Sequence, residues 1–162
     1  AYTDHRDRQT YKVVKVGDTF WFAEDLKYAS PHSLIDEGSG VRYYYGTNLK
    51  DAAPEGWKIA GRKDFKSLFS HSGGSITKVN EHGLNIKANG IMHHEGVYNP
   101  REYYFMTAEH PGLLRKDKKM IVDVRIDSKV NSHSEWIHIT AAPVRCLTKN
   151  GNIISALVKR RQ

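Results

Sequence analysis

The sequence predicts an α+β domain that consists mostly of antiparallel strands. Short runs of alternating apolar and polar residues occur near both ends of the chain, and turn residues separate them. One segment, at 62–71, has the apolar spacing of a helix. A length of 162 residues suits one domain over 1–162, and 39% hydrophobic with 27% charged residues is ordinary for a soluble globular protein.

The stretch from Asp4 to Leu26 is expected to form a hairpin. Residues 10–16 and 19–23 are typical of short strands, and Gly17-Asp18 supplies the turn between them. Alternation along both runs places their larger apolar side chains on buried faces, namely Tyr11, Val13, Phe20 and Phe22. Two short strands cannot bury these side chains together with Trp21, so later segments must cover them.

The next segments predict a strand, a turn and a helix. Residues 41–46 (VRYYYG) form a short strand in which at least one of three consecutive tyrosines should be exposed, because neighbours point to opposite sides. Residues 54–57 (PEGW) form a turn that delivers Trp57 to the face of Ile59. In the helix at 62–71, apolar residues fall at i, i+3 and i+4, and two glycines end the run.

Residues 73–118 are long, mixed and punctuated by glycine. Such a stretch inside a compact domain is usually a functional loop, and we expect this one to present the binding face. Its best candidate for a buried strand is 103–107 (YYFMT).

Regular patterns return towards the C-terminus. Strands are predicted at 120–126, 136–139 and 144–148, with Asp123 and Arg125 on the solvent face of the first. We expect the helix at 62–71 and the strand at 144–148 to cover the opening hairpin. Asn150-Gly151 predicts a two-residue turn with positive φ at both positions, followed by a final hairpin strand within 152–159.

The net charge of +7 is concentrated at the C-terminal end, where residues 145–162 hold five basic groups and no acidic group. A basic end attracts nucleic acid or other polyanions, and the candidate contacts are Lys149, Lys159, Arg160 and Arg161. The alternative is a terminus that only increases solubility. No apolar run approaches the roughly 20 residues that a membrane helix needs.

Several blocks of the sequence resemble one known family. They are DHRDRQTYKVVKVGDTFWFAEDLKY, PEGWKIAGRKDFKSL, GLNIKANGI, YYFMTAEH and VRIDSKVNSHSEWIHITAAPVRCLTK. Together these blocks resemble the Fibrobacter succinogenes major paralogous domain over about residues 4–149, and the first and last blocks are the most specific. The resemblance implies a C-type-lectin-like fold in which N- and C-terminal strands pair and a long loop region presents the ligand site. It also implies an extracellular or cell-surface protein of a bacterium.

The chain departs from the family in three places. Residues 105–109 (FMTAE) replace a W-S-S-T-E block, and Ala53 stands where many members have a cysteine, so Cys146 lacks that partner. The calcium and sugar motif of the wider lectin fold is missing, since 98–101 (YNPR) has no acidic residue before Asn-Pro. The calcium-dependent sugar mechanism is therefore not expected here.

Two groups of residues invite a chemical reading. His93 and His94 precede Glu95, but adjacent histidines on a strand diverge and no second ligand pair follows, which favours a polar loop over a metal site. Cys146, the only cysteine, lies in a predicted core strand and is typical of a small buried hydrophobe rather than a nucleophile. The sequence therefore predicts no enzyme, no metal and no cofactor.

The expected function is that of a non-enzymatic binding or adhesion module that recognises a glycan or a protein through residues 73–118. The candidate ligand-binding residues in that range are His93, His94, Tyr98, Arg101 and Tyr103. One alternative is a structural or interaction subunit of a bacterial surface assembly. The other is a nucleic-acid or polyanion binder that uses the basic end.

Overall fold

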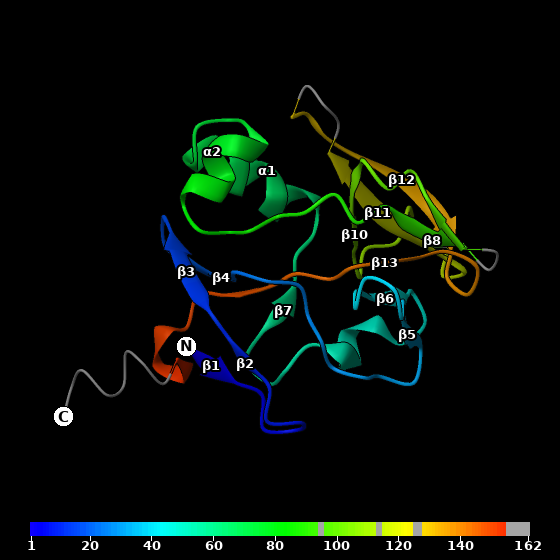
Figure 1. Cartoon of the computed structure of the whole chain (residues 1–162), viewed down its shortest axis with the longest axis horizontal. Coiled ribbons are helices and arrows are strands. Elements are labelled where there is room, and N and C mark those ends of the chain that lie inside the picture. Colours follow the sequence, from blue (N-terminus) through cyan, green and yellow to red (C-terminus); the bar gives the residue numbers. More distant parts are fainter. Residues whose placement is uncertain (94–95, 113–114, 125–127, 155–162) are drawn as a thin grey trace.

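The computed structural model describes residues 1–93, 96–112, 115–124 and 128–154. Within these residues the chain forms antiparallel sheets and two short α-helices (Figure 1), which confirms the α+β class. None of the helices in this part of the chain is long and apolar enough to cross a membrane.

The opening hairpin belongs to a four-stranded sheet that joins both ends of the chain. Its strands, in spatial order, are β3 (Val13–Val16), β4 (Thr19–Phe22), β14 (Cys146–Thr148) and β7 (Lys58–Ile59). The predicted turn forms with Gly17 at φ 61°, and Leu147 pairs with Trp21 across β14 and β4. A two-stranded sheet of β1 (Tyr2–Thr3) and β2 (Thr10–Tyr11) precedes it.

Trp21 and Phe22 point to opposite faces of this sheet and belong to two different cores. The Trp21 ring lies 5.4 Å from that of Phe65, under the first helix. The Phe22 ring lies 4.2 Å from that of Tyr11 and 4.4 Å from that of Trp57. The helix therefore covers one face as expected. The strand at 144–148 lies beside the hairpin rather than over it, and Trp57 covers the second face instead.

Helix α1 (Arg62–His71) has the bounds that the sequence predicts. Phe65, Leu68 and Phe69 are buried on its inner face. Helix α2 (Ile76–Glu81) follows, and the Ser75 hydroxyl accepts a bond from the Lys78 N–H at its start.

A three-stranded sheet forms from β10 (Tyr103–Met106), β11 (Lys118–Val124) and β12 (Val130–Trp136). The strand predicted at 136–139 is wrong, because β12 ends at Trp136 and a turn follows, in which the Ile137 N–H bonds the Asp117 carbonyl. Asp123 is buried rather than solvent-facing, with 7% of the residue exposed, and its carboxylate lies 3.6 Å from Nδ1 of His133 on β12. Arg125 lies outside the described residues.

The five-stranded sheet is assembled from distant parts of the chain. Its strands, in spatial order, are β5 (Ser33–Ile35), β6 (Arg42–Tyr45), β13 (Ala141–Ala142), β8 (Ile91–His93) and β9 (Gly96–Tyr98). The expectation of an exposed tyrosine in β6 is wrong. Tyr43 and Tyr44 are buried on opposite faces and Tyr45 is half-buried, because both sides of β6 are covered.

Two further predictions need correction. Residues 73–118 do not form one long loop, since α2, β8, β9 and β10 lie within them. Asn150 has a φ of −94°, and a 3-10 turn occupies Gly151–Ile153 in place of the two-residue hairpin turn. Most of the final strand predicted within 152–159 lies outside the described residues. Another 3-10 turn, Leu49–Ala52, leads to the predicted turn before Trp57.

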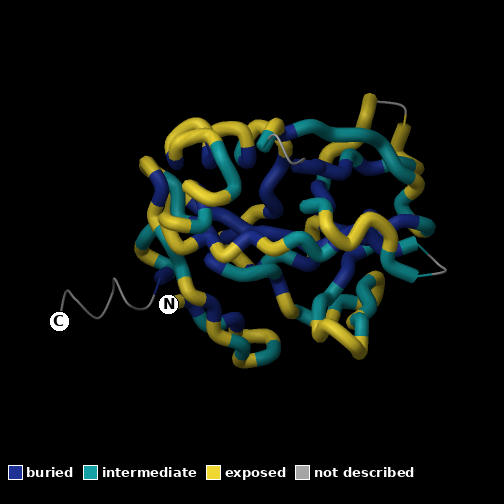
Figure 2. The backbone as a smooth tube through the Cα atoms, turned by 45° about the horizontal axis from the view of Figure 1, so that its top comes forward, coloured by how far each residue is buried: buried dark blue, intermediate teal, exposed yellow. Residues whose placement is uncertain are grey.

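The buried backbone runs through the middle of the molecule, and exposed residues gather on the helices and outer turns (Figure 2). The residues before β5 and the segment after α2 each contribute buried side chains to this core, among them Leu26, Leu84 and Ile86, and their other residues lie near the turn before β6. They meet at the groove described next.

Candidate ligand-binding groove

The sequence-predicted ligand residues only partly come together. His93 on β8 and Tyr98 on β9 are neighbours, with ring centroids 5.2 Å apart, and Tyr98 is exposed. Arg101 is exposed in the turn after β9, whereas Tyr103 packs against the core beneath α1. His94 lies outside the described residues. The structure therefore does not gather the four described residues into one site.

A chain of polar contacts holds His93 against β12. The buried Thr140 hydroxyl lies 3.2 Å from His93 Nδ1 and 3.2 Å from Glu135 Oε1. The second Glu135 oxygen lies 3.0 Å from His133 Nε2. Among the described residues, no group of three or more His, Cys, Asp or Glu side chains could hold a metal ion.

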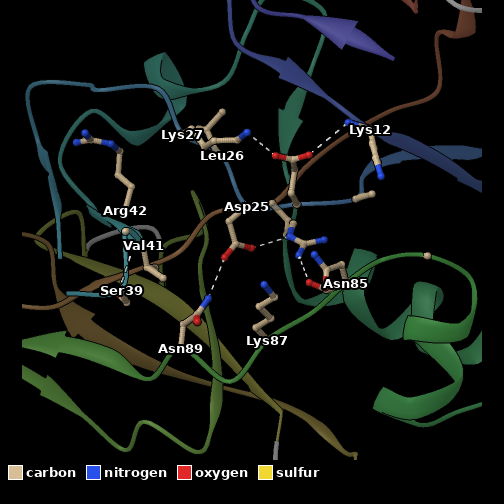
Figure 3. A pocket seen from close by; sticks show the side chains of 15 residues that line it. Lys12, Asp25, Leu26, Lys27, Ser39, Val41, Arg42, Asn85, Lys87 and Asn89 are labelled. Atoms are coloured by element: carbon tan, nitrogen blue, oxygen red, sulfur yellow. Dashed lines mark hydrogen bonds and ion pairs between the residues drawn. The ribbon is translucent and has the colours of Figure 1, made fainter. Parts of the chain in front are cut away.

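An open groove of about 600 Å³ lies between the opening block, the turn before β6 and the segment after α2. We call it the basic groove. Figure 3 shows its lining, which consists of Lys12, Ala23, Glu24, Asp25, Leu26, Lys27, Ser39, Gly40, Val41, Arg42, Gly83, Asn85, Lys87, Asn89 and Arg145.

The floor of the basic groove is an ion pair between Arg145 and Asp25. Arg145 Nε lies 2.7 Å from Asp25 Oδ1, although only 2% of the arginine side chain is exposed. The same guanidinium donates to the carbonyls of three residues from two other segments, at 2.6–3.1 Å: Phe22, Leu84 and Asn85. Arg145 therefore joins the closing strand, the opening block and the segment after α2.

Polar contacts also fix the wall formed by residues 83–89. Asn89 Nδ2 donates to the second oxygen of Asp25 at 3.1 Å, and the Tyr43 hydroxyl donates to the Asn89 carbonyl at 2.6 Å. Asn85 has a φ of 50°, which places it in the left-handed region that asparagine tolerates. These contacts hold the wall in one position without any ligand.

Four basic side chains surround the floor (Figure 3): Lys12, Lys27, Arg42 and Lys87. Lys27 forms an ion pair with Glu24, and Arg42 donates to the Ser33 hydroxyl. Within the part of the chain that the structure describes, Lys12, Arg42 and Lys87 form no ion pair. The rim therefore holds positive charge that the described carboxylates do not neutralise.

Sequence reasoning missed this groove, but one signal in the chain points to it. Asn85, Lys87 and Asn89 alternate with the apolar or small Leu84, Ile86 and Ala88, the pattern of an extended segment with one polar face. Leu84 and Ile86 are buried, so the polar members face the groove.

The other sequence candidates lie elsewhere. Lys149 is exposed, and its amine lies 3.6 Å from Asp18 Oδ2 across the tip of the opening hairpin. Lys159, Arg160 and Arg161 lie outside the described residues. Cys146 is fully buried, and burial raises the pKa of its thiol above the ordinary value. A buried, protonated thiol lacks the access and thiolate character of a nucleophile.

No family model, curated protein sequence or solved structure matches this chain.

Proposed function

We propose that this chain is a non-enzymatic ligand-binding module of a bacterial surface or secreted protein, with a C-type-lectin-like fold and its ligand in the basic groove. The sequence resemblance supports the fold and the location, and the pairing of β4 with β14 from opposite ends of the chain supports the fold. Within the binding region that the sequence predicts at 73–118, we assign the ligand contacts to the 83–89 wall. The other residues that contact the ligand belong to the opening block and to the turn before β6.

One observation carries the proposal: uncompensated basic side chains surround a rigid floor inside an open groove. The volume of about 600 Å³ lies within the range of roughly 300–1,000 Å³ typical of ligand sites. The floor is already hydrogen-bonded, so binding does not have to order it, and preorganisation of this kind improves affinity.

The floor favours binding over catalysis. Arg145 and Asn89 occupy both oxygens of Asp25, and Lys27 contacts Glu24. A general acid or base needs a pKa near the working pH and a free path to the substrate. The Ser39 hydroxyl of the lining donates to Asp36 Oδ2 at 2.6 Å in an exposed turn, and the described lining contains no histidine and no thiol.

A binding screen with charge-reversal variants tests the site. Wild-type protein, the groove variant Lys12→Glu/Lys87→Glu and the control variant Lys63→Glu/Lys66→Glu are applied to a glycan array and to a pull-down from bacterial surface proteins. Lys63 and Lys66 are exposed on α1 and do not line the groove, so the control matches the change in charge. We expect the wild type and the control to bind alike and the groove variant to lose its ligand.

A fourth protein, Tyr98→Ala/Arg101→Ala, tests the face that the sequence predicted first. If that variant loses binding while the groove variant keeps it, the ligand lies at the end of β9 and the turn that follows it, and the groove assignment is wrong.

A further inference from the structure

We infer that the basic groove takes an acidic polysaccharide, a chain of sugar rings that bear carboxylate or sulfate groups. This inference rests on the proposed function and adds the chemical class of the ligand. It follows from the side chains that the described lining contains and from those that it lacks.

The first argument concerns aromatic residues. None of the described lining residues is aromatic. Single-stranded nucleic acids bind largely by stacking of bases on aromatic rings, worth about 1–3 kcal/mol per base. Without an aromatic surface, the groove lacks the contact that contributes most to the binding of unpaired bases. For the same reason, the groove has no aromatic ring on which the flat face of a neutral sugar could pack.

The second argument concerns apolar anchors. Peptide ligands usually depend on a few apolar or aromatic side chains that fill pockets in the partner. Of the apolar side chains in the described lining, those of Ala23 and Leu26 are buried, and that of Val41 is partly exposed. Such a groove could form ion pairs with an acidic peptide, but it has no apolar pocket for the side chains of that peptide.

The third argument concerns the spacing of the groups that remain. Along the 83–89 wall a basic side chain lies between two neutral amides, since Lys87 stands between Asn85 and Asn89. An acidic polysaccharide can present a matching pattern: in a polyuronic acid, for example, each ring has one carboxylate together with hydroxyls. Ammonium groups and amides can donate to both kinds of oxygen.

The experiment compares ligands that share one backbone. Binding of size-defined oligogalacturonate and of its fully methyl-esterified form is measured by calorimetry in the presence of a calcium chelator. Dextran sulfate and unmodified dextran form a second pair, which separates sulfate from carboxylate recognition. Backbone amide signals of Gly83, Lys87 and Asn89 report independently whether a ligand enters the groove.

We expect at least one acidic saccharide to bind roughly tenfold more tightly than its neutral partner, and its affinity to fall as salt rises. The variant Lys12→Gln/Lys87→Gln should bind about tenfold more weakly and with a shallower dependence on salt, because two exposed charge contacts are removed. Lys63→Gln/Lys66→Gln should bind as the wild type does.

Three results would overturn the inference, and they separate it from the proposed function. Equal binding of the neutral form, with the groove amides shifted, leaves the groove as the ligand site but rejects the acidic class. Tighter binding of polyaspartate or of single-stranded oligothymidine through the same lysines rejects the saccharide. Groove amides that respond to none of these ligands reject both the saccharide and the groove.

Discussion

Arg145 shows how much one side chain can organise. Its guanidinium is buried and bonds Asp25 together with the carbonyls of Phe22, Leu84 and Asn85. A guanidinium has a planar fork of five donors, whereas an ammonium group has three donors and no such fixed geometry. Arg145 is therefore required both for packing and for the shape of the groove.

Replacement of Arg145 should unfold or strongly destabilise the protein. Arg145→Met leaves the Asp25 carboxylate without its cation and three carbonyls without donors, and we expect a loss of about 3–5 kcal/mol in the free energy of unfolding. Urea denaturation measures this loss. Arg62→Met, at an exposed position on α1, should change stability by less than about 0.5 kcal/mol. A similar small effect at Arg145 would contradict its structural role.

Asp4 and Arg6 form a second ion pair, with 2.8 Å between Asp4 Oδ2 and Arg6 Nη2. Burial alone would raise the pKa of the Asp4 carboxyl, but the hydrogen bonds from the Arg6 side chain and backbone, and its charge, hold the pKa below the ordinary value. The folded state thus favours the ionised carboxyl. The stabilisation is complete above the ordinary pKa of about 3.9 and is lost as pH falls through the lower folded value.

The Asp4→Asn variant should accordingly lose less stability on acidification than the wild type does. Urea denaturation between about pH 6 and pH 2 measures the slope for both proteins. Parallel slopes would show that Asp4 titrates alike in the folded and unfolded chains.

Helix α1 depends on a residue far away in the sequence. The Arg62 N–H donates to Glu109 Oε1 at 2.9 Å, and the Gly61 N–H donates to Asp64 Oδ2 at 2.8 Å. The first N–H groups of a helix have no partner within it, so these carboxylates supply the missing acceptors. Their negative charge also suits the positive end of the helix dipole.

Removal of the Glu109 carboxylate should weaken the start of α1. We expect Glu109→Ala to cost about 0.5–2 kcal/mol in the free energy of unfolding, the range for loss of a capping side chain, and Glu109→Gln to cost less. Thermal denaturation followed by circular dichroism gives both values. Glu37→Ala, at an exposed turn, is the control, and an equal effect there would argue against a capping role.

Local patterns explain which elements the sequence could predict. The spacing of Phe65, Leu68 and Phe69 is enough for α1, because its buried face is continuous in sequence. Residues 136–139 alternate like a strand, yet the chain turns there towards Asp117, a contact with no local signature. Helix α2 and strand β8 also lack a local signature, because the segments that bury their side chains are distant in the sequence.

At the scale of the whole molecule, the two larger cores of the described residues lie on opposite faces of the sheet that joins both ends of the chain, and a third, smaller cluster holds Tyr43, Met92 and Ala141. Trp21 and Phe65 pack in one core, and Phe22 packs in the other. Residues in contact have coupled effects on stability, whereas distant residues contribute independently.

A pair of double-mutant cycles should reveal this separation. The changes Trp21→Leu and Phe65→Leu should show a coupling energy of about 0.5–1.5 kcal/mol, the range for an aromatic pair. The changes Phe22→Leu and Phe65→Leu should add to within about 0.5 kcal/mol. Urea denaturation of the single and double variants supplies both numbers, and equal coupling in the two cycles would indicate one continuous core.

The groove is a property of the whole chain, which is why sequence reasoning did not locate it. Its lining comes from the opening block, the 39–42 turn, the 83–89 wall and Arg145. The face predicted from loop length contains Tyr98 and Arg101, which are exposed, but Tyr103 packs inward. The alternation of Asn85, Lys87 and Asn89 gave the one local indication of the groove. It does not indicate which segments form the other walls.

The contacts of Arg145 also determine when the groove can exist. Its bonds span 60 to 123 residues of chain, so they form only after the two ends have met. Loops of this length are slow to close, and folds rich in such contacts form on timescales of about milliseconds to seconds. A chain still emerging from the ribosome therefore has no groove of this shape until Arg145 and β14 are available.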